Sequence, residues 1–364
     1  MLRIVFFIII SLHGLIHFMG FAKAFGYGNM QQLKIPVSKS TGMLWLAVAV
    51  LFIVSSILFL QHKNSWWLVA MPATILSQII IGMSWQDAKA GTFANLLILM
   101  AATLGFTAYR FENSYRQDVK ENLLHNNNIT AELVTEKDIA HLPLPVQKYL
   151  RYAGVLNKPK VKNARIVFEG QMRDKGKEWF PFTSEQYDFF DEPARLFFMK
   201  GQMHGITVPG YHHYIKGNAT MDIRLFGLFP IIKKQGSTMD TAETVTLFND
   251  MCLMVPSALA GSHVQWQSVD GNTAKATFAN HGIIISATLY FNDKGELINF
   301  TSNDRTAIAE MKKYPFSTPC GKYKNFNGYN LQSEGYGVWH YPGGEFAYGK
   351  FILKSVEYNV KGLP

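Results

Sequence analysis

Long apolar runs dominate the first third of the chain. Four of them span residues 2–21, 42–60, 65–83 and 92–108. Each is close to the ~20 apolar residues that an α-helix needs to cross the ~30 Å hydrocarbon core of a bilayer. Trp66 and Trp67 at one end of the third run, and Trp85 beyond its other end, are typical of membrane–water interfaces. We therefore predict a four-helix transmembrane domain over residues 1–110.

The chain becomes polar after the fourth run. Residues 111–130 lack a long apolar stretch and predict a juxtamembrane linker. In the next stretch, "TAELVTEKDIAHLPLPVQKYLRYAG", Pro143 and Pro145 separate two short helices, and Gly154 ends the second.

Beyond residue 160 the apolar positions recur with a period of two. Stretches such as "ARIVFEGQMR", "GIIISATLYF" and "ELINFTS" are rich in β-branched and aromatic residues and predict strands. Asp-Lys-Gly at 293–295 and Pro-Gly-Gly at 342–344 predict hairpin turns. We expect roughly ten antiparallel strands, too many for a flat open sheet.

One helix interrupts the strands, over residues 237–255. Ser237 or Thr238 is the expected cap, and Pro256 ends or kinks the helix. It is apolar on more than one face and therefore needs burial, for which the concave side of the sheet is suited. The predicted fold class is an α + β membrane protein. A four-helix transmembrane bundle precedes a strongly curved antiparallel β-sheet, a half-barrel that wraps a helix, over residues 131–364.

Basic residues are concentrated around the apolar runs. Residues 1–120 carry nine Lys and Arg against three Asp and Glu, whereas the remaining chain is nearly balanced. Lys and Arg anchor helix ends at membrane interfaces, so the net charge of +9 does not indicate a nucleic-acid partner. Because the chain is expected to cross the membrane four times and carries a large C-terminal domain, we expect both termini in the cytoplasm.

His13 and His17 lie one turn apart inside the first apolar run. An ionisable residue at that depth is a functional-site hypothesis by default. Gln78 and Asn95 are the polar side chains expected to face them. Three interpretations remain open: hydrogen bonding that stabilises the bundle, a contact to a small molecule such as a quinone, or a metal or haem site.

The β-rich half offers scattered acids and histidines but no catalytic motif. His212 and His213 face opposite sides of a strand and cannot chelate one ion. Glu185 and Asp188 could perform acid–base chemistry only if the fold brings two carboxylates together.

Cys252 and Cys320 are the two cysteines of the chain. Neither belongs to a CxxC or Cys/His cluster, so the cysteines indicate neither a zinc site nor a thioredoxin-like site. No sequence motif calls for a cofactor. Two free thiols and one disulfide both remain open.

Aromatic residues are more abundant in the β-rich half than a thin sheet needs. A curved sheet lined by Phe, Met and Trp and crossed by a helix can be a filled core or a container for an apolar ligand. The candidate ligand-binding residues are Trp179, Phe182, Tyr187, Phe198, Tyr211, His213, Phe248, Met251, Trp266, Trp339 and Phe346.

Four motifs carry a resemblance to known proteins: "LPLPVQKYLRYAG", "FEGQMR…WFPFTSEQY", "MDIRLFGLFPII" and "WHYPGGEFAYGKFILKSVEYN". Together they resemble an uncharacterised bacterial domain family over about residues 142–360, with no established activity. The half-barrel is similar in shape to bacterial lipoprotein carriers, and the N-terminal bundle resembles DoxX-like four-span proteins. The resemblance implies a multi-pass protein of the bacterial inner membrane.

The leading functional hypothesis is a membrane-anchored binding protein. Its half-barrel would hold a lipid or another apolar small molecule close to the bilayer. One alternative is a membrane-bound redox or hydrolytic enzyme, and another is a membrane-tethered scaffold that binds proteins.

Overall fold

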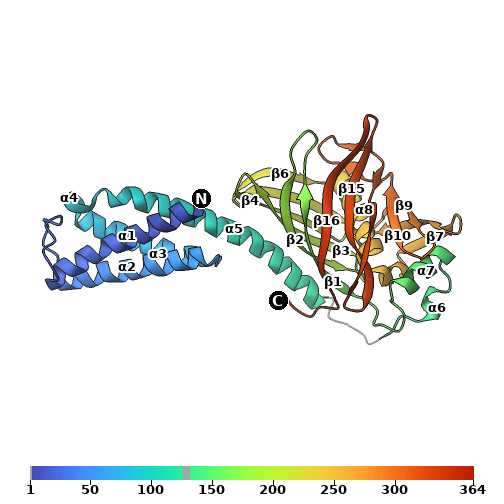
Figure 1. Cartoon of the computed structure of the whole chain (residues 1–364), viewed down its shortest axis with the longest axis horizontal. Helices are drawn as coiled ribbons and strands as arrows, with labels where there is room; N and C mark the ends of the chain where they lie inside the picture. Colours follow the sequence, from blue (N-terminus) through green and yellow to red (C-terminus); the bar gives the residue numbers. More distant parts are fainter. Residues whose placement is uncertain (1, 126–131) are drawn as a thin grey trace. The chain divides into compact units, whose positions relative to one another are not determined.

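The computed structural model describes residues 2–125 and 132–364. The chain divides into two compact units (Figure 1). The first contains Met1–Phe111 with Phe226–Leu228, and the second contains Glu112–Leu225 with Phe229–Pro364.

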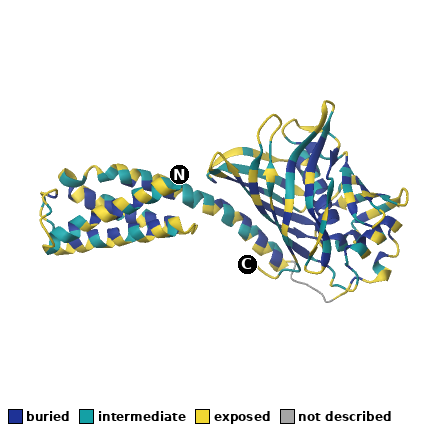
Figure 2. Cartoon of the chain, in the orientation of Figure 1, coloured by how far each residue is buried: buried dark blue, intermediate teal, exposed yellow. Residues whose placement is uncertain are grey.

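The first unit is helical. It contains α1 (Leu2–Phe25), α2 (Lys39–Leu60), α3 (Trp66–Met83), the short α4 (Trp85–Ala88) and the first part of α5 (Gly91–His125). Within the described residues, four of these helices are long and apolar enough to cross a membrane, as predicted. Figure 2 shows many exposed positions, in yellow, along these helices. The large apolar residues that are exposed there include Ile4, Ile8, Leu12, Ile16, Leu44, Val50, Ile57, Leu68, Ile75, Ile79, Phe93, Leu96 and Met100. Such a surface suits lipid and is unfavourable in water.

Small residues let α1 and α2 approach closely. A Cβ atom on Gly20 would lie 2.1 Å from Cδ2 of Trp45, which is closer than real atoms pack. Glycine at this position therefore makes room for the buried indole of Trp45.

Residues 111–130 were predicted to be a linker. In the structure, α5 continues through this segment without a break as far as His125. Residues 126–131 lie outside the described part of the chain. Residues 112–125 of α5 belong to the second unit.

Two short helices follow, as predicted: α6 (Glu136–Ile139) and α7 (Leu144–Tyr152). Thr135 and Asp138 form a capping box that begins α6. The Thr135 hydroxyl and backbone N–H both donate to the Asp138 carboxylate and hold its pKa at about 2. Gly154, with φ of +71°, follows the second helix.

One large antiparallel sheet forms the second unit. Its order among the described residues is β6-β5-β4-β3-β2-β1-β16-β15-β13-β10-β9-β8-β7, with β14 also paired to β15, and β11 (Thr306–Ala307) pairs separately with β12 (Lys312–Lys313). The strands are β1 (Asn163–Met172), β2 (Phe180–Phe189), β3 (Ala194–Met203), β4 (Ile206–Ile215), β5 (Asn218–Leu225), β6 (Phe229–Gln235), β7 (Val264–Ser268), β8 (Thr273–Asn280), β9 (Ile283–Phe291), β10 (Leu297–Ser302), β13 (Phe316–Ser317), β14 (Cys320–Phe326), β15 (Tyr329–Tyr341) and β16 (Gly344–Tyr358).

The sheet is curled into a half-barrel (Figure 1), which confirms the predicted fold class. Bulges at Val167/Phe168 and Gly337/Val338 interrupt the register where β16 pairs with β1 and β15. A bulge increases local twist and bends its strand. The strands outnumber the ten expected because several, such as β13, are too short to show a period.

Helix α8 (Ser237–Met254) lies against the concave side of the sheet, followed by a 3₁₀ turn, Pro256–Ala260. The cap is Gly236 and not Ser237 or Thr238, because the helix begins one residue earlier than expected. Phe248 stacks on Phe278 of β8 with ring centroids 5.1 Å apart. The concave side is therefore filled with side chains along this helix.

Candidate functional site

The two faces of the sheet have different neighbours. Gln186 of β2, Arg195 of β3 and His212 of β4 all hydrogen-bond to α8 or to side chains that contact it. We call this the inner face. Because side chains alternate along a strand, Tyr187, Phe198 and Tyr211 lie on the opposite, outer face.

The predicted ligand-binding residues divide between these faces. Phe182 of β2 and Phe248 and Met251 of α8 are buried in the main core. Tyr187, Phe198 and Tyr211 lie on the outer face, where Tyr115 of α5 covers them. The ring centroid of Tyr115 lies 5.2 Å from that of Phe198 and 5.5 Å from that of Tyr211.

Polar contacts fix the same part of α5 to the outer face. The Tyr211 hydroxyl donates to Asp118 at 2.7 Å, and the Lys200 ammonium lies 2.6 Å from Glu112. The Tyr115 hydroxyl donates to the backbone carbonyl of Glu185 at 3.2 Å. His213 lies beside Tyr211 on this face, with ring centroids 5.9 Å apart. Tyr187, Phe198 and Tyr211 therefore form a docking site for the helix.

Trp339 belongs to an aromatic group on the inner face. Phe316 and Trp339 are paired across β13 and β15, with ring centroids 5.1 Å apart. Tyr348 lies next to them, and its hydroxyl oxygen accepts a 3.0 Å hydrogen bond from Arg305 Nη1. Phe346 packs against the same group.

The remaining two candidates lie elsewhere. Trp179 is flanked by two cations, with the Arg173 guanidinium 4.4 Å and the Lys350 ammonium 4.3 Å from its ring. Trp266 donates to the carbonyl of Leu259 and packs against the main core.

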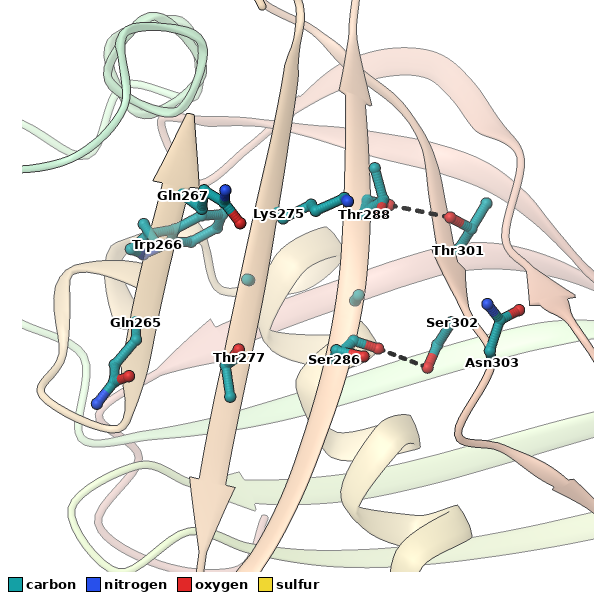
Figure 3. Close-up of a pocket in the computed structure, with 12 residues that line it drawn as sticks. Gln265, Trp266, Gln267, Lys275, Thr277, Ser286, Thr288, Thr301, Ser302 and Asn303 are labelled. Atoms are coloured by element: carbon teal, nitrogen blue, oxygen red, sulfur yellow. Dashed lines mark hydrogen bonds between the residues drawn. The ribbon is translucent and has the colours of Figure 1, made fainter. Parts of the chain in front are cut away.

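A polar hollow lies on the sheet where β7 to β10 run side by side (Figure 3). Its volume is about 480 Å³. Its lining residues are Gln265, Trp266, Gln267, Lys275, Ala276, Thr277, Ser286, Ala287, Thr288, Thr301, Ser302 and Asn303. Amides and hydroxyls dominate, so this hollow does not suit an apolar ligand.

Several partly exposed apolar side chains pack against the main core, and we call four of them the apolar edge: Met172, Met221, Ile308 and Phe351. Register places Phe351 opposite Gly170 and Met221 opposite His212, so both point to the inner face. None of the four was a candidate from the sequence, because strand periodicity does not show where a core opens to solvent.

A buried charged cluster lies between the sheet and α8. Arg195 donates through Nε to Asp250 at 2.7 Å and through Nη1 to Glu243 at 3.0 Å. Its side chain is only 7% exposed. Gln186 donates through Nε2 to both Asp250 and Asp188, at 3.0 and 2.8 Å. Burying a lone charge is very costly, so these groups depend on one another.

Asp188 is the least satisfied member of this cluster. Its Oδ2 atom accepts from Gln186, whereas Oδ1 is buried without a hydrogen-bond partner among the described residues. Burial, and then the charge of Asp250, raise the pKa of Asp188 well above its usual range. The protonated, neutral carboxyl is thus the form that the interior favours.

Glu243 behaves in the opposite way. Burial alone would raise its pKa, but His212 and Arg195 outweigh that effect and lower the pKa to about 2. The His212 Nδ1 atom lies 2.7 Å from a Glu243 oxygen. His213, its neighbour in sequence, faces the other side, in agreement with the alternation expected of a strand.

The sequence pointed to Asp188 and Glu185 as candidate acids, and the structure separates them onto opposite faces. Gln186 instead links Asp188 to Asp250 of α8, which is distant in the sequence, by donating to both carboxyl groups. A carboxylate and an amide in an otherwise apolar stretch, such as Asp250 and Asn249 in "LFNDMCLM", were the available signal.

Ser317, His340 and Glu345 form a hydrogen-bonded relay on the outer face. The Ser317 hydroxyl lies 2.8 Å from Nε2 of His340, whose Nδ1 lies 3.3 Å from Glu345. A nucleophilic serine also needs donors for the oxyanion, often the next backbone N–H. Here the N–H of Thr318 already donates to the Phe300 carbonyl. These three residues therefore do not support the alternative that the protein is a hydrolytic enzyme.

In the first unit, the two histidines share a polar network. His13 Nε2 lies 2.8 Å from Asn95 Oδ1, and His17 Nε2 lies 2.9 Å from the Ser77 hydroxyl. Asn95 in turn donates to Gln78 at 3.0 Å. Each buried ring thus has a protein partner, which is what bundle stability requires.

Both cysteines are free thiols, and burial raises the pKa of each. Among the described residues, no group of three or more His, Cys, Asp and Glu side chains could hold a metal ion.

Comparison with known proteins gives one match by sequence. A model for a family of unknown function, DUF6544, matches residues 132–351. No curated protein matches the chain.

The solved structures to which the chain is similar include two proteins at low identity. A LolA superfamily protein from Nitrosomonas europaea is 8% identical, with a TM-score of 0.35, over 64% of this chain and 96% of its own. A beta-barrel-like protein with a domain of unknown function, DUF1849, from Brucella abortus is 8% identical, with a TM-score of 0.19, over 55% of this chain and 99% of its own.

Proposed function

The chain belongs to the DUF6544 family of unknown function, and from its own structure we propose that the half-barrel binds one apolar chain, such as a lipid acyl chain, along the apolar edge. The observation that carries this proposal is that Met172, Met221, Ile308 and Phe351 pack against the main core and yet remain partly exposed. Burying apolar surface stabilises a complex by about 0.8 kcal/mol per CH₂ group.

The apolar helices of the first unit also support the proposal. They would hold the β-domain at a bacterial inner membrane, with both termini in the cytoplasm, so the domain would meet lipid at a high effective concentration. Helix α8 fills the inner face beneath the edge, so only a single chain at the edge would fit without displacing the core.

Native mass spectrometry of the full chain released from lipid nanodiscs tests this function. The wild-type protein should retain one lipid more than the double variant Met172→Gln/Met221→Gln, whose folding is checked by circular dichroism. Ile352→Gln is the matched control, because Ile352 is 44% exposed and follows Phe351 on the other face of β16. Equal lipid retention by a folded double variant would overturn the proposal.

A further inference from the structure

Arg305 is a cation without an acidic partner at the inner face. Its guanidinium lies 4.0 Å from the ring of Phe316, 5.2 Å from Trp339 and 5.6 Å from Tyr348. It shares one hydrogen bond with the Tyr348 hydroxyl, and it forms no ion pair with any carboxylate that the structure describes. A guanidinium has five N–H donors in a fixed plane, so most of them remain available.

The aromatic rings hold this cation in place. Cation–π contacts fix the orientation of a guanidinium without neutralising its charge. A preoriented arginine with free donors is well suited to a carboxylate or a phosphate, which it can bind through two parallel hydrogen bonds.

Arg305 also adjoins the apolar edge. Ile308 follows it by three residues on the same segment, and Phe351 follows Tyr348 by three residues on β16. An amphiphile with its chain on the edge would therefore bring its headgroup to the guanidinium.

The nearby carboxylates form their contacts with other groups and not with Arg305. Glu243 is close enough to be influenced by Arg305 but is already paired with Arg195 and His212. Asp304, the neighbour of Arg305, instead accepts from the backbone and hydroxyl of Ser286.

We infer that Arg305, held by Phe316, Trp339 and Tyr348, binds the anionic oxyacid headgroup of a single-chain amphiphile whose tail lies on the apolar edge. This inference rests on the proposed function and names its ligand class. Long-chain carboxylates and alkyl phosphates share the required chemistry.

Photo-crosslinking of the full chain in neutral-lipid nanodiscs tests the inference. Three probes carry the same diazirine-labelled sixteen-carbon tail (a size of this order suits the ~30 Å bilayer) and differ in headgroup: carboxylate, phosphate monoester or alcohol. Peptide mapping by mass spectrometry measures the labelling of the segments that contain Met172, Met221 and Phe351.

The wild-type protein should label at least about tenfold more with one or both anionic probes than with the alcohol, as expected for a charge-assisted hydrogen bond. Arg305→Gln should remove this preference, and Arg305→Lys should restore part of it. Lys350→Gln is the matched control, because this ammonium lies 4.3 Å from the ring of Trp179 on the other face of β16. It should keep the preference.

The outcomes separate the two proposals. Equal labelling of these segments by all three probes leaves the apolar site standing and overturns the headgroup inference, as does a preference that survives in Arg305→Gln. Absence of labelling with every probe overturns both. A difference between the two anionic probes identifies which headgroup the site takes.

Discussion

At the scale of single residues, the buried charged cluster is the least expected feature of this chain. Arg195 pairs with two carboxylates, Glu243 and Asp250, whereas burial and Asp250 raise the pKa of a third carboxyl, Asp188, and favour its neutral form. Keeping one acid protonated limits the excess of negative charge in the interior.

Replacing Asp188 by Asn tests this protonation state. A native pKa above the unfolded value means that the folded protein binds more protons, so wild-type stability falls as pH rises from about 4. Asn cannot ionise, so Asp188→Asn should gain stability over wild type by up to about 1.4 kcal/mol per pH unit. The urea midpoint of the full chain in nanodiscs, measured from pH 4 to 8, checks this.

The control for that experiment is Asp191→Asn, which removes an exposed carboxylate three residues away. A stability difference between Asp188→Asn and wild type that stays constant over this pH range would show that Asp188 is ionised in the fold.

Residue-level chemistry was only partly predictable. Alternation correctly placed His212 and His213 on opposite faces, because a period of two is a local property. The meeting of Asp188 with Asp250 depends on how α8 lies in the sheet, which no local pattern specifies.

At the scale of elements, the C-terminal part of α5 is the main departure from expectation. Its buried residues Tyr115, Val119 and Leu123 recur every four positions, which is the signature of one helical face. The intervening charged residues hid this stripe and suggested a linker. The longer strands and helix α8 were predictable because their apolar positions recur regularly over many residues.

Tyr115→Ala tests the docking of this helix. Tyr115 is 2% exposed and packs on Phe198 and Tyr211, so its truncation should destabilise the docked helix by about 3–5 kcal/mol. Hydrogen exchange of residues 112–125 in the full chain should then become markedly faster. Unchanged exchange would mean that the outer face does not hold the helix; Tyr109→Ala, at an exposed position on the same helix, is the control.

At the scale of the whole molecule, each unit combines a buried core with exposed apolar side chains, which are unfavourable in water. The helices of the first unit expose apolar side chains along their length, and the β-domain exposes the apolar edge at the border of its core. Composition predicted the first surface. The apolar edge could not be predicted in this way. Its position depends on how the fourteen-stranded sheet and α8 pack together, which only the tertiary structure shows.

The most direct test of apolar-chain binding uses the methionines of the β-domain. The full chain, ¹³C-labelled at methionine methyl groups, is placed in nanodiscs with a fatty amide that carries a spin label near its tail. We expect strong broadening of the Met172 and Met221 signals and little broadening of Met254, which is buried at the C-terminal end of α8 beside Gln332. Broadening of Met254 equal to or greater than that of Met172 and Met221 would contradict binding at the apolar edge.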